Sequence, residues 1–146
     1  MRILLTGASG FLGSHIAEQL DQQGADVRAL VRPTSDTGFL EGLQHVTLMR
    51  GALSDRGSLL AATEGVDGII HAAGLVKARR PADFYRTNEL GTANLLDAAK
   101  ANAPEIKVLL QPNSSDSGFR KMPSMVLKKA IWENISAAEV PTITQP

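Results

Sequence analysis

Hydrophobic residues follow two alternating patterns along the chain. Short continuous runs are typical of buried strands and occur at 2–6, 26–31, 46–49, 66–70, 106–110 and 140–144. Between these runs, apolar residues at helical spacing predict helices at 11–23, around 59–61, at 82–101 and at 124–139. Strands that alternate with helices imply a parallel sheet with helices on both of its faces.

This alternation predicts one α/β domain over residues 1–146, with a doubly wound sheet of about six strands. Right-handed crossover connections give the strand order 3-2-1-4-5-6. Gly24 is expected to stop the first helix. Ser54 or Asp55 is expected to cap the helix that follows the third strand. The segment 111–123 is polar and is expected to form an irregular loop.

The turn after the first run carries three glycines, in the sequence Thr6-Gly7-Ala8-Ser9-Gly10-Phe11-Leu12-Gly13. Gly7 permits a tight turn, Gly10 lets a phosphate approach the backbone, and Gly13 lets the next helix pack closely. Free N–H groups at the helix start, helped by the helix dipole, would face the phosphates. Strand, glycine turn and helix in this order build the dinucleotide site of a Rossmann fold, which we favour over a plain tight turn.

The end of the second strand is the place where such a site selects its cofactor. An acidic residue there would bind the ribose hydroxyls of NAD, but the sequence has Val31-Arg32. Arg32, helped by Arg28 or Ser35, could hold the 2′-phosphate of NADP through charge-assisted hydrogen bonds. The alternative interpretation is a solvated surface arginine. We therefore expect NADP as the cofactor, with NAD as the alternative.

Composition excludes several other classes of protein. The formal net charge is zero, which gives no basis for a nucleic-acid or membrane surface. The absence of cysteine excludes disulfides, thiolate metal sites and cysteine nucleophiles, and His, Asp and Glu show no metal-ligand spacing. The N-terminal apolar run is too short for a transmembrane helix and lacks the form of a signal peptide, so we expect a cytoplasmic protein.

Several motifs, in the right order, resemble the extended short-chain dehydrogenase/reductase superfamily. They are TGASGFLG, then VRPTS, then HAAG at 71–74, and then Asn88-Glu89-Leu90-Gly91-Thr92. The nearest branch is the NAD-dependent epimerase/dehydratase family, which includes sugar-nucleotide epimerases and dihydroflavonol-reductase-like enzymes. The run VRPTSDTGFLEGL is similar to the hopanoid-associated sugar epimerases. The resemblance implies hydride transfer on a sugar-nucleotide or carbonyl substrate.

The resemblance also implies roles for the matching positions. The cofactor's pyrophosphate would be lined by Thr6, Gly7, Ser9, Gly10, Phe11, Leu12 and Gly13. Arg32 and Leu53 would lie at the adenosine end, and the small residues Ala72, Ala73 and Gly74 would pass beneath the cofactor. Asn88 would lie near the active site, although a polar residue on a helix face is the alternative. His71 is structural in this family.

The sequence departs from the family pattern at three places, of which the first affects cofactor binding and the other two affect catalysis. The family's third strand ends in Gly-Asp-Leu, whose aspartate contacts adenine. Here Ala52 replaces it, at a loss of about 1 kcal/mol. The acid/base tyrosine of the family's Tyr-x-x-x-Lys motif is replaced by Met125, which cannot transfer a proton. The substrate domain that normally follows the sixth strand is expected to be largely missing.

The remaining catalytic candidates are a serine and a lysine. The family's catalytic serine would be Ser114, Ser115 or Ser117, and we select Ser115. Lys129 keeps the place of the motif lysine and could hold ribose hydroxyls of the cofactor. The alternative for Lys129 is a solvated lysine beside Lys128.

Three functional hypotheses follow. The first is an NAD(P)-dependent epimerase, dehydratase or reductase. The second is a non-catalytic NAD(P)-binding sensor or partner protein, and the third is an inactive product of a degenerate or incomplete gene. We adopt dinucleotide binding with impaired turnover. A homodimer is also expected, because family dimers often pair helices equivalent to 82–101 and 124–139.

Overall fold

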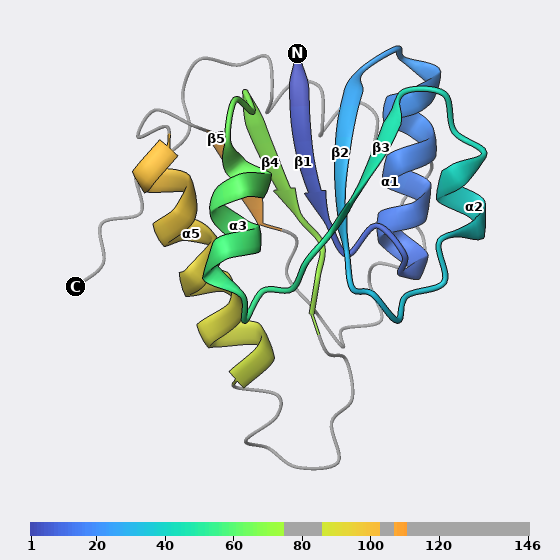
Figure 1. Ribbon diagram of the computed structural model, residues 1–146. Coiled ribbons are helices and arrows are strands. Elements are labelled where there is room, and N and C mark those ends of the chain that lie inside the picture. The colour runs from blue at the N-terminus through green and yellow to red at the C-terminus, as the bar shows by residue number, and fades with distance from the viewer. Residues whose placement is uncertain (75–85, 103–106, 111–146) are drawn as a thin grey trace, which may run out of the picture.

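The computed structural model describes residues 1–74, 86–102 and 107–110, which form a five-stranded sheet in the order β3-β2-β1-β4-β5 (Figure 1). The strands are β1 (Arg2–Thr6), β2 (Asp26–Val31), β3 (Val46–Arg50), β4 (Gly68–His71) and β5 (Lys107–Leu110). The helices are α1 (Phe11–Gln22), α2 (Gly38–Glu41), α3 (Arg56–Thr63), the π-helix η1 (Arg86–Leu90) and α5 (Gly91–Asn102). Every pairing is parallel, as predicted. The observed order also confirms the predicted order for these five strands.

The predicted helix at 124–139 and strand at 140–144 lie outside the described residues, as does the loop at 111–123. The order of the five described strands places β1 at the centre, with β2 on one side and β4 on the other. The chain leaves β3 and crosses over to β4, so the order reverses between β1 and β4. In open α/β sheets such a reversal opens a crevice at the carboxyl ends of the strands.

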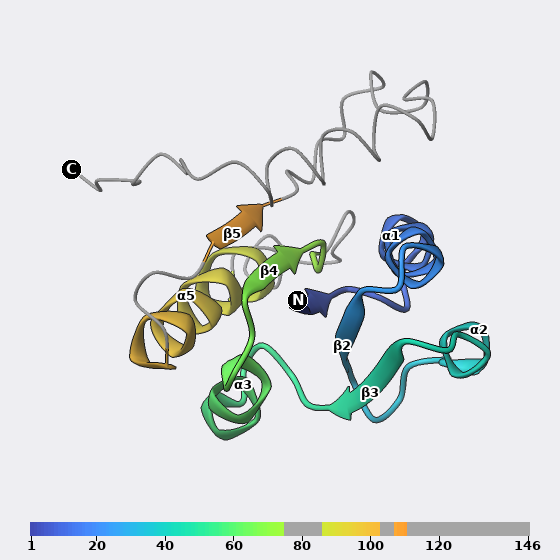
Figure 2. The ribbon, with the colours of Figure 1, turned by 90° about the horizontal axis from the view of Figure 1, so that it is seen from above.

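Residues of β1 point alternately to the two faces of the sheet, and this gives the domain two cores. Ile3 and Leu5 pack against α1, whereas Leu4 packs against Leu59 of α3 and Leu95 of α5. All five side chains are fully buried. Figure 2 shows α1 and α2 on one side of the sheet and α3 and α5 on the other. The predicted coverage of both faces is therefore confirmed.

The helix ends show which local signals the chain uses. Gly24 has φ +70° and follows the end of α1, as predicted. Asp55, and not Ser54, caps α3, because its carboxylate accepts a hydrogen bond of 3.0 Å from the amide of Gly57. The long helix predicted at 82–101 contains η1 before α5. There the Thr92 hydroxyl donates to the Asn88 carbonyl at 2.5 Å, the oxygen that the amide of Thr92 would use in an α-helix.

Candidate functional site

The turn between β1 and α1 is packed so tightly that two of its glycines have no room for a side chain. Gly7 has φ +75°, and a Cβ on it would lie 2.6 Å from the backbone of Ala72 and Ala73 at the end of β4. A Cβ on Gly13 would lie 2.0 Å from the Gly7 carbonyl oxygen. The amide of Gly10 donates to that same oxygen at 2.9 Å. The turn therefore brings the backbone of α1 directly against the ends of β1 and β4.

The start of α1 leaves backbone donors free for a ligand. Gly10 is the residue before the helix, and no side chain caps α1. The first amides of a helix lack intrahelical partners, and the helix dipole favours an anion beside them. The Phe11 side chain is 86% exposed and the Leu12 side chain packs against the core that contains α1. These two residues therefore offer their backbone amides, and not their side chains, to a ligand at this end of the helix. A diphosphate fits this arrangement.

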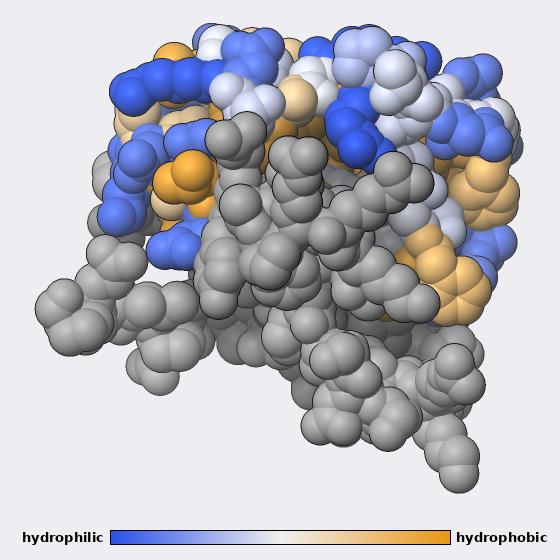
Figure 3. Space-filling model, turned by 90° about the horizontal axis from the view of Figure 1, so that it is seen from below, coloured by the Kyte–Doolittle hydropathy of each residue, from blue (hydrophilic) through white to orange (hydrophobic). Residues whose placement is uncertain are grey.

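A cleft of about 660 Å³ opens at the carboxyl ends of the strands, beside this turn. Figure 3 views the molecule from that end, and on the coloured part of this face hydrophilic residues surround smaller hydrophobic patches. The sequence-predicted residues that line the cleft are Thr6, Gly7, Ser9, Gly10, Arg32, Leu53, Ala72, Ala73 and Gly74. Phe11, Leu12, Gly13 and Asn88 are not among the lining residues. The candidates Ser115 and Lys129, together with Met125, lie outside the described residues.

Arg32 stands at the end of the cleft that β2 and β3 form. The residue is exposed, and its carbonyl accepts hydrogen bonds from the amide of Ser35 at 3.0 Å and from the Arg50 guanidinium at 3.3 Å. Within the described part of the chain, the guanidinium of Arg32 itself makes no hydrogen bond or ion pair. A cationic side chain that is held by its backbone and faces open solvent at a cleft is suited to bind an anion.

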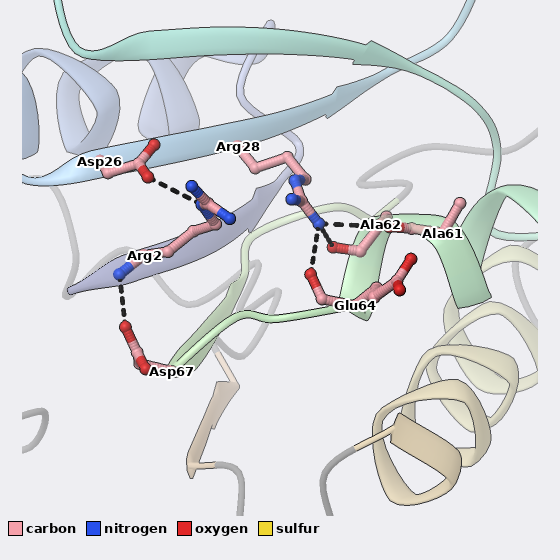
Figure 4. Close-up of polar contacts among 7 residues, drawn as sticks. All are labelled: Arg2, Asp26, Arg28, Ala61, Ala62, Glu64 and Asp67. Carbon is pink, nitrogen blue, oxygen red and sulfur yellow. Dashed lines mark hydrogen bonds and ion pairs between the residues drawn. The ribbon is translucent and has the colours of Figure 1, made fainter.

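The structure overturns Arg28 as a helper of Arg32. Its guanidinium donates to the carbonyls of Ala61, Ala62 and Glu64 at 3.2, 2.8 and 2.8 Å, at the end of α3 (Figure 4). These carbonyls have no partners within the helix, and a cation beside them is also favoured by the helix dipole. Arg28 is therefore used to hold α3 against β2 and does not line the cleft. Ser35, the other predicted helper, does line it.

The loop after β3 forms the opposite wall at this end, and sequence reasoning missed most of its contacts. Ser58 accepts a hydrogen bond of 3.2 Å from the Ala52 amide, and the Asn94 side-chain amide donates to the Leu53 carbonyl at 2.9 Å. Asn94 lines the cleft, as does Gly91, where a Cβ would lie 3.0 Å from Leu53. A glycine inside a helical pattern indicates close approach of another segment. Gly91 could therefore have predicted the contact between this helix and the loop after β3.

The described residues contain neither a helix that could span a membrane nor a cluster of candidate metal ligands. None of their helices is long and apolar enough to cross a membrane. No three His, Asp or Glu residues among them come together as a candidate metal site.

A parallel sheet whose first crossover carries a glycine turn at a switch-point cleft defines a Rossmann dinucleotide-binding domain. The model of the NAD dependent epimerase/dehydratase family matches residues 3–121. The chain therefore belongs to that family, within the extended short-chain dehydrogenase/reductases.

Curated relatives and solved structures agree with this assignment. The chain is 39% identical over 101 residues to 4-hydroxy-2-methyl-3-oxo-4-farnesyl-3,4-dihydroquinoline-1-oxide ketoreductase of Stigmatella aurantiaca, covering 68% of this chain and 30% of that protein. It is 34% identical over 133 residues to photosystem II assembly factor Ycf39 of Cyanophora paradoxa, covering 91% and 40%. The Bordetella bronchiseptica enzyme WbmG in complex with NAD has a TM-score of 0.66 and 27% identity, covering 75% and 36%. The chain spans about a third of the length of curated relatives such as the ketoreductase.

Proposed function

We propose that the chain binds a nicotinamide dinucleotide in this cleft, with NADP preferred over NAD. The observation that carries the proposal is the turn between β1 and α1, where Gly7 and Gly13 have no room for a side chain and α1 starts without a side-chain cap. Thr6, Ser9, Gly10 and the first amides of α1 would bind the pyrophosphate. The structure of WbmG in complex with NAD supports the binding of a dinucleotide in the equivalent fold.

The preference for NADP rests on Arg32. The adenosine ribose would lie at the carboxyl end of β2, where the free guanidinium of Arg32 and the hydroxyl of Ser35 would meet a 2′-phosphate. Among the described residues, no acidic side chain lines the cleft there to hold the ribose hydroxyls of NAD. Ala52 and Leu53 would enclose the adenine, and Ala72, Ala73 and Gly74 would lie beneath the cofactor.

The reaction proposed for the protein is hydride transfer on a sugar-nucleotide or carbonyl substrate, as in epimerases, dehydratases and reductases of the family. The nicotinamide of a bound cofactor would supply or accept the hydride. Ser115 and Lys129 would assist, with Lys129 and Asn88 near the nicotinamide ribose. Met125 stands in the place of the tyrosine and has no proton to exchange, so we propose that turnover is impaired.

The second candidate function is a non-catalytic NAD(P)-binding sensor or partner protein. The similarity to Ycf39, which covers 91% of this chain and is named as an assembly factor, favours it. Met125 favours it as well, because binding needs no acid/base group. The two candidates share the dinucleotide site and differ only in turnover.

The experiment that tests the proposal is a calorimetric titration of the purified chain with NADPH and with NADH. We expect both to bind and NADPH to bind more tightly. Failure of both to bind at millimolar concentration would overturn the proposal. Binding without hydride transfer to any member of a carbonyl panel would favour the sensor or partner function.

A tyrosine replacement tests the catalytic alignment separately. Met125→Tyr restores the Tyr-x-x-x-Lys spacing to Lys129, so we expect NADPH oxidation with a carbonyl panel to rise above that of the unaltered chain. Met122→Tyr is the matched control, since it adds the same side chain three positions earlier. Equal rates in both variants would contradict the assignment of Met125 to the tyrosine position.

A further inference from the structure

His71 lies at the end of β4 and forms a hydrogen bond with each of its ring nitrogens. Nδ1 is 2.5 Å from the hydroxyl oxygen of Thr6, and Nε2 is 2.9 Å from the hydroxyl oxygen of Thr92. Thr6 is 1% exposed and His71 is 4% exposed. The ring therefore joins the last residue of β1 to the second residue of α5, and it is buried between them.

The number of hydroxyl hydrogens determines which ring nitrogen carries the proton. Thr92 has one hydroxyl hydrogen and donates it to the Asn88 carbonyl at 2.5 Å, so its oxygen must accept from Nε2–H of His71. A neutral ring with hydrogen on Nε2 has a bare Nδ1, which accepts from the Thr6 hydroxyl. The Thr6 oxygen in turn accepts from the amide of Ala73 at 3.4 Å. We call this series of hydrogen bonds, from Asn88 and Thr92 through His71 to Thr6 and Ala73, the relay. With hydrogen on Nε2, every polar atom of the relay has a partner.

This relay connects three segments that surround the cleft. Thr6 precedes Gly7 in the glycine turn, and Ala73 belongs to the segment after β4; all three line the cleft. Thr92 follows Gly91, another lining residue, and Asn88 lies on η1 one turn earlier. A ring that binds all three segments fixes the distance between the phosphate turn and the helix that carries Asn88.

The neutral state of the ring follows from its surroundings. Burial lowers the pKa of His71 below its ordinary value of 6.5. Both ring partners are threonine hydroxyls, and no ion pair of the described residues involves His71. The charged residues of β1, η1, α5 and β5, the elements packed around it, are Arg2, Arg86, Glu89, Asp97, Lys100 and Lys107. Of these, Arg2, Glu89, Asp97 and Lys100 are exposed.

We propose that His71, as a neutral imidazole with its hydrogen on Nε2, is a positioning residue that holds the glycine turn in place for the cofactor. Protonation would put a second hydrogen on Nδ1, which would then donate to Thr6. The Thr6 hydroxyl hydrogen would lose its acceptor in this buried site, and the turn would lose one of its fixed contacts. Cofactor affinity therefore falls when His71 is protonated. This effect on affinity rests on the proposed function, whereas the assignment of the hydrogen to Nε2 does not.

The tautomer is tested on the free protein by two-dimensional proton–nitrogen NMR of the histidine rings. We expect His71 to show a protonated Nε2 and a bare Nδ1 at neutral pH, with the exposed His15 and His45 as reference signals in the same spectra. In Thr92→Val, which removes the acceptor of Nε2–H, this preference is lost. A cationic ring, or hydrogen on Nδ1, in the unaltered chain would overturn the proposal even if no cofactor were bound.

The positioning role is tested by the affinity for NADP⁺ from about pH 7.5 down to the lowest pH at which the chain is still folded, because burial lowers the pKa of His71 below 6.5. The unaltered chain is expected to lose affinity more steeply as the pH falls than His71→Gln, which cannot titrate. Both chains meet the same ligand, so titration of its phosphate cancels in the comparison. Thr92→Val is expected to weaken binding about fivefold at neutral pH, and the exposed Thr47→Val, on β3, not at all. Equal pH profiles, or equal affinities of the two threonine variants, would overturn the role.

Discussion

One end of the cleft is built from backbone and the other from side chains. At the glycine turn, Gly7 and Gly13 have no room for a side chain, and the first amides of α1 have no side-chain cap. At the opposite end, the exposed Arg32 and the loop after β3 offer a guanidinium and apolar walls. A backbone site recognises any diphosphate and tolerates no added volume, whereas a side-chain site can change its preference through one substitution. The first end should therefore decide whether a dinucleotide binds, and the second end which one.

The largest effect is expected at the backbone end, from Gly13→Ala. The added Cβ would lie 2.0 Å from the Gly7 carbonyl oxygen, so the turn must shift. We expect about 3 kcal/mol less stability toward urea and loss of both NADPH and NADH binding. Gly57→Ala on α3 is the control, because its Cβ would meet nothing closer than 3.4 Å. A Gly13→Ala chain with unaltered affinity for both cofactors would remove the distinction between the two ends.

A smaller loss of stability is expected from Arg28→Leu. The variant removes the hydrogen bonds to the carbonyls of Ala61, Ala62 and Glu64, which are partly exposed, at a cost of about 1.5 kcal/mol in urea unfolding. Arg56→Leu, at the exposed start of α3, is the control. The ratio of NADPH to NADH affinity is expected to stay unchanged in Arg28→Leu. A selective loss of NADPH affinity would place Arg28 in the site after all.

A substitution at the side-chain end of the cleft is expected to tighten cofactor binding. Ala52→Asp supplies the carboxylate that the family pattern places beside adenine, and we expect tighter binding of NADPH and NADH, each by about fivefold, equivalent to ~1 kcal/mol. Ala61→Asp, exposed on α3, controls for the added negative charge. Because adenine is common to both cofactors, a change confined to one of them would contradict the placement of Ala52 beside the base.

The smallest effect concerns the pH dependence of stability. Burial lowers the pKa of His71 below 6.5, so the unfolded chain takes up a proton at a higher pH than the folded chain does. The stabilisation is complete above pH 6.5 and is lost as the pH falls from 6.5 toward the folded pKa. The difference in Tm between the unaltered chain and His71→Gln should therefore shrink between about pH 7.5 and pH 5.5. A difference that grows as the pH falls would show that the folded chain binds the proton more tightly.

Much of the framework could be predicted from the sequence because it depends on local patterns. Apolar runs located the five strands, and right-handed crossovers determined their order. The glycine turn was predicted by spacing alone, since Gly7 needs a positive φ and Gly13 needs space. The helix cap at Asp55 was one of two predicted residues.

Contacts between distant segments could not be predicted in this way. Arg28 was a candidate for the cofactor because it lies near Arg32 in sequence, yet its partners are residues 33 to 36 positions later. Asn94 reaches Leu53, 41 positions away, and His71 reaches Thr92, 21 positions away, only in the folded chain. The π-helix η1 was missed because hydrophobic spacing does not distinguish it from an α-helix over five residues.

The division of roles between the two ends is tested most directly by titrating the unaltered chain and Arg32→Ala with NADPH and NADH. Loss of a charged hydrogen-bond donor to the 2′-phosphate is expected to weaken NADPH by at least about tenfold and to leave NADH within about twofold. Lys100→Ala, which removes an exposed charge from the last turn of α5, is expected to change neither affinity. Equal weakening of both cofactors by Arg32→Ala would contradict the 2′-phosphate role and, with it, the preference for NADP.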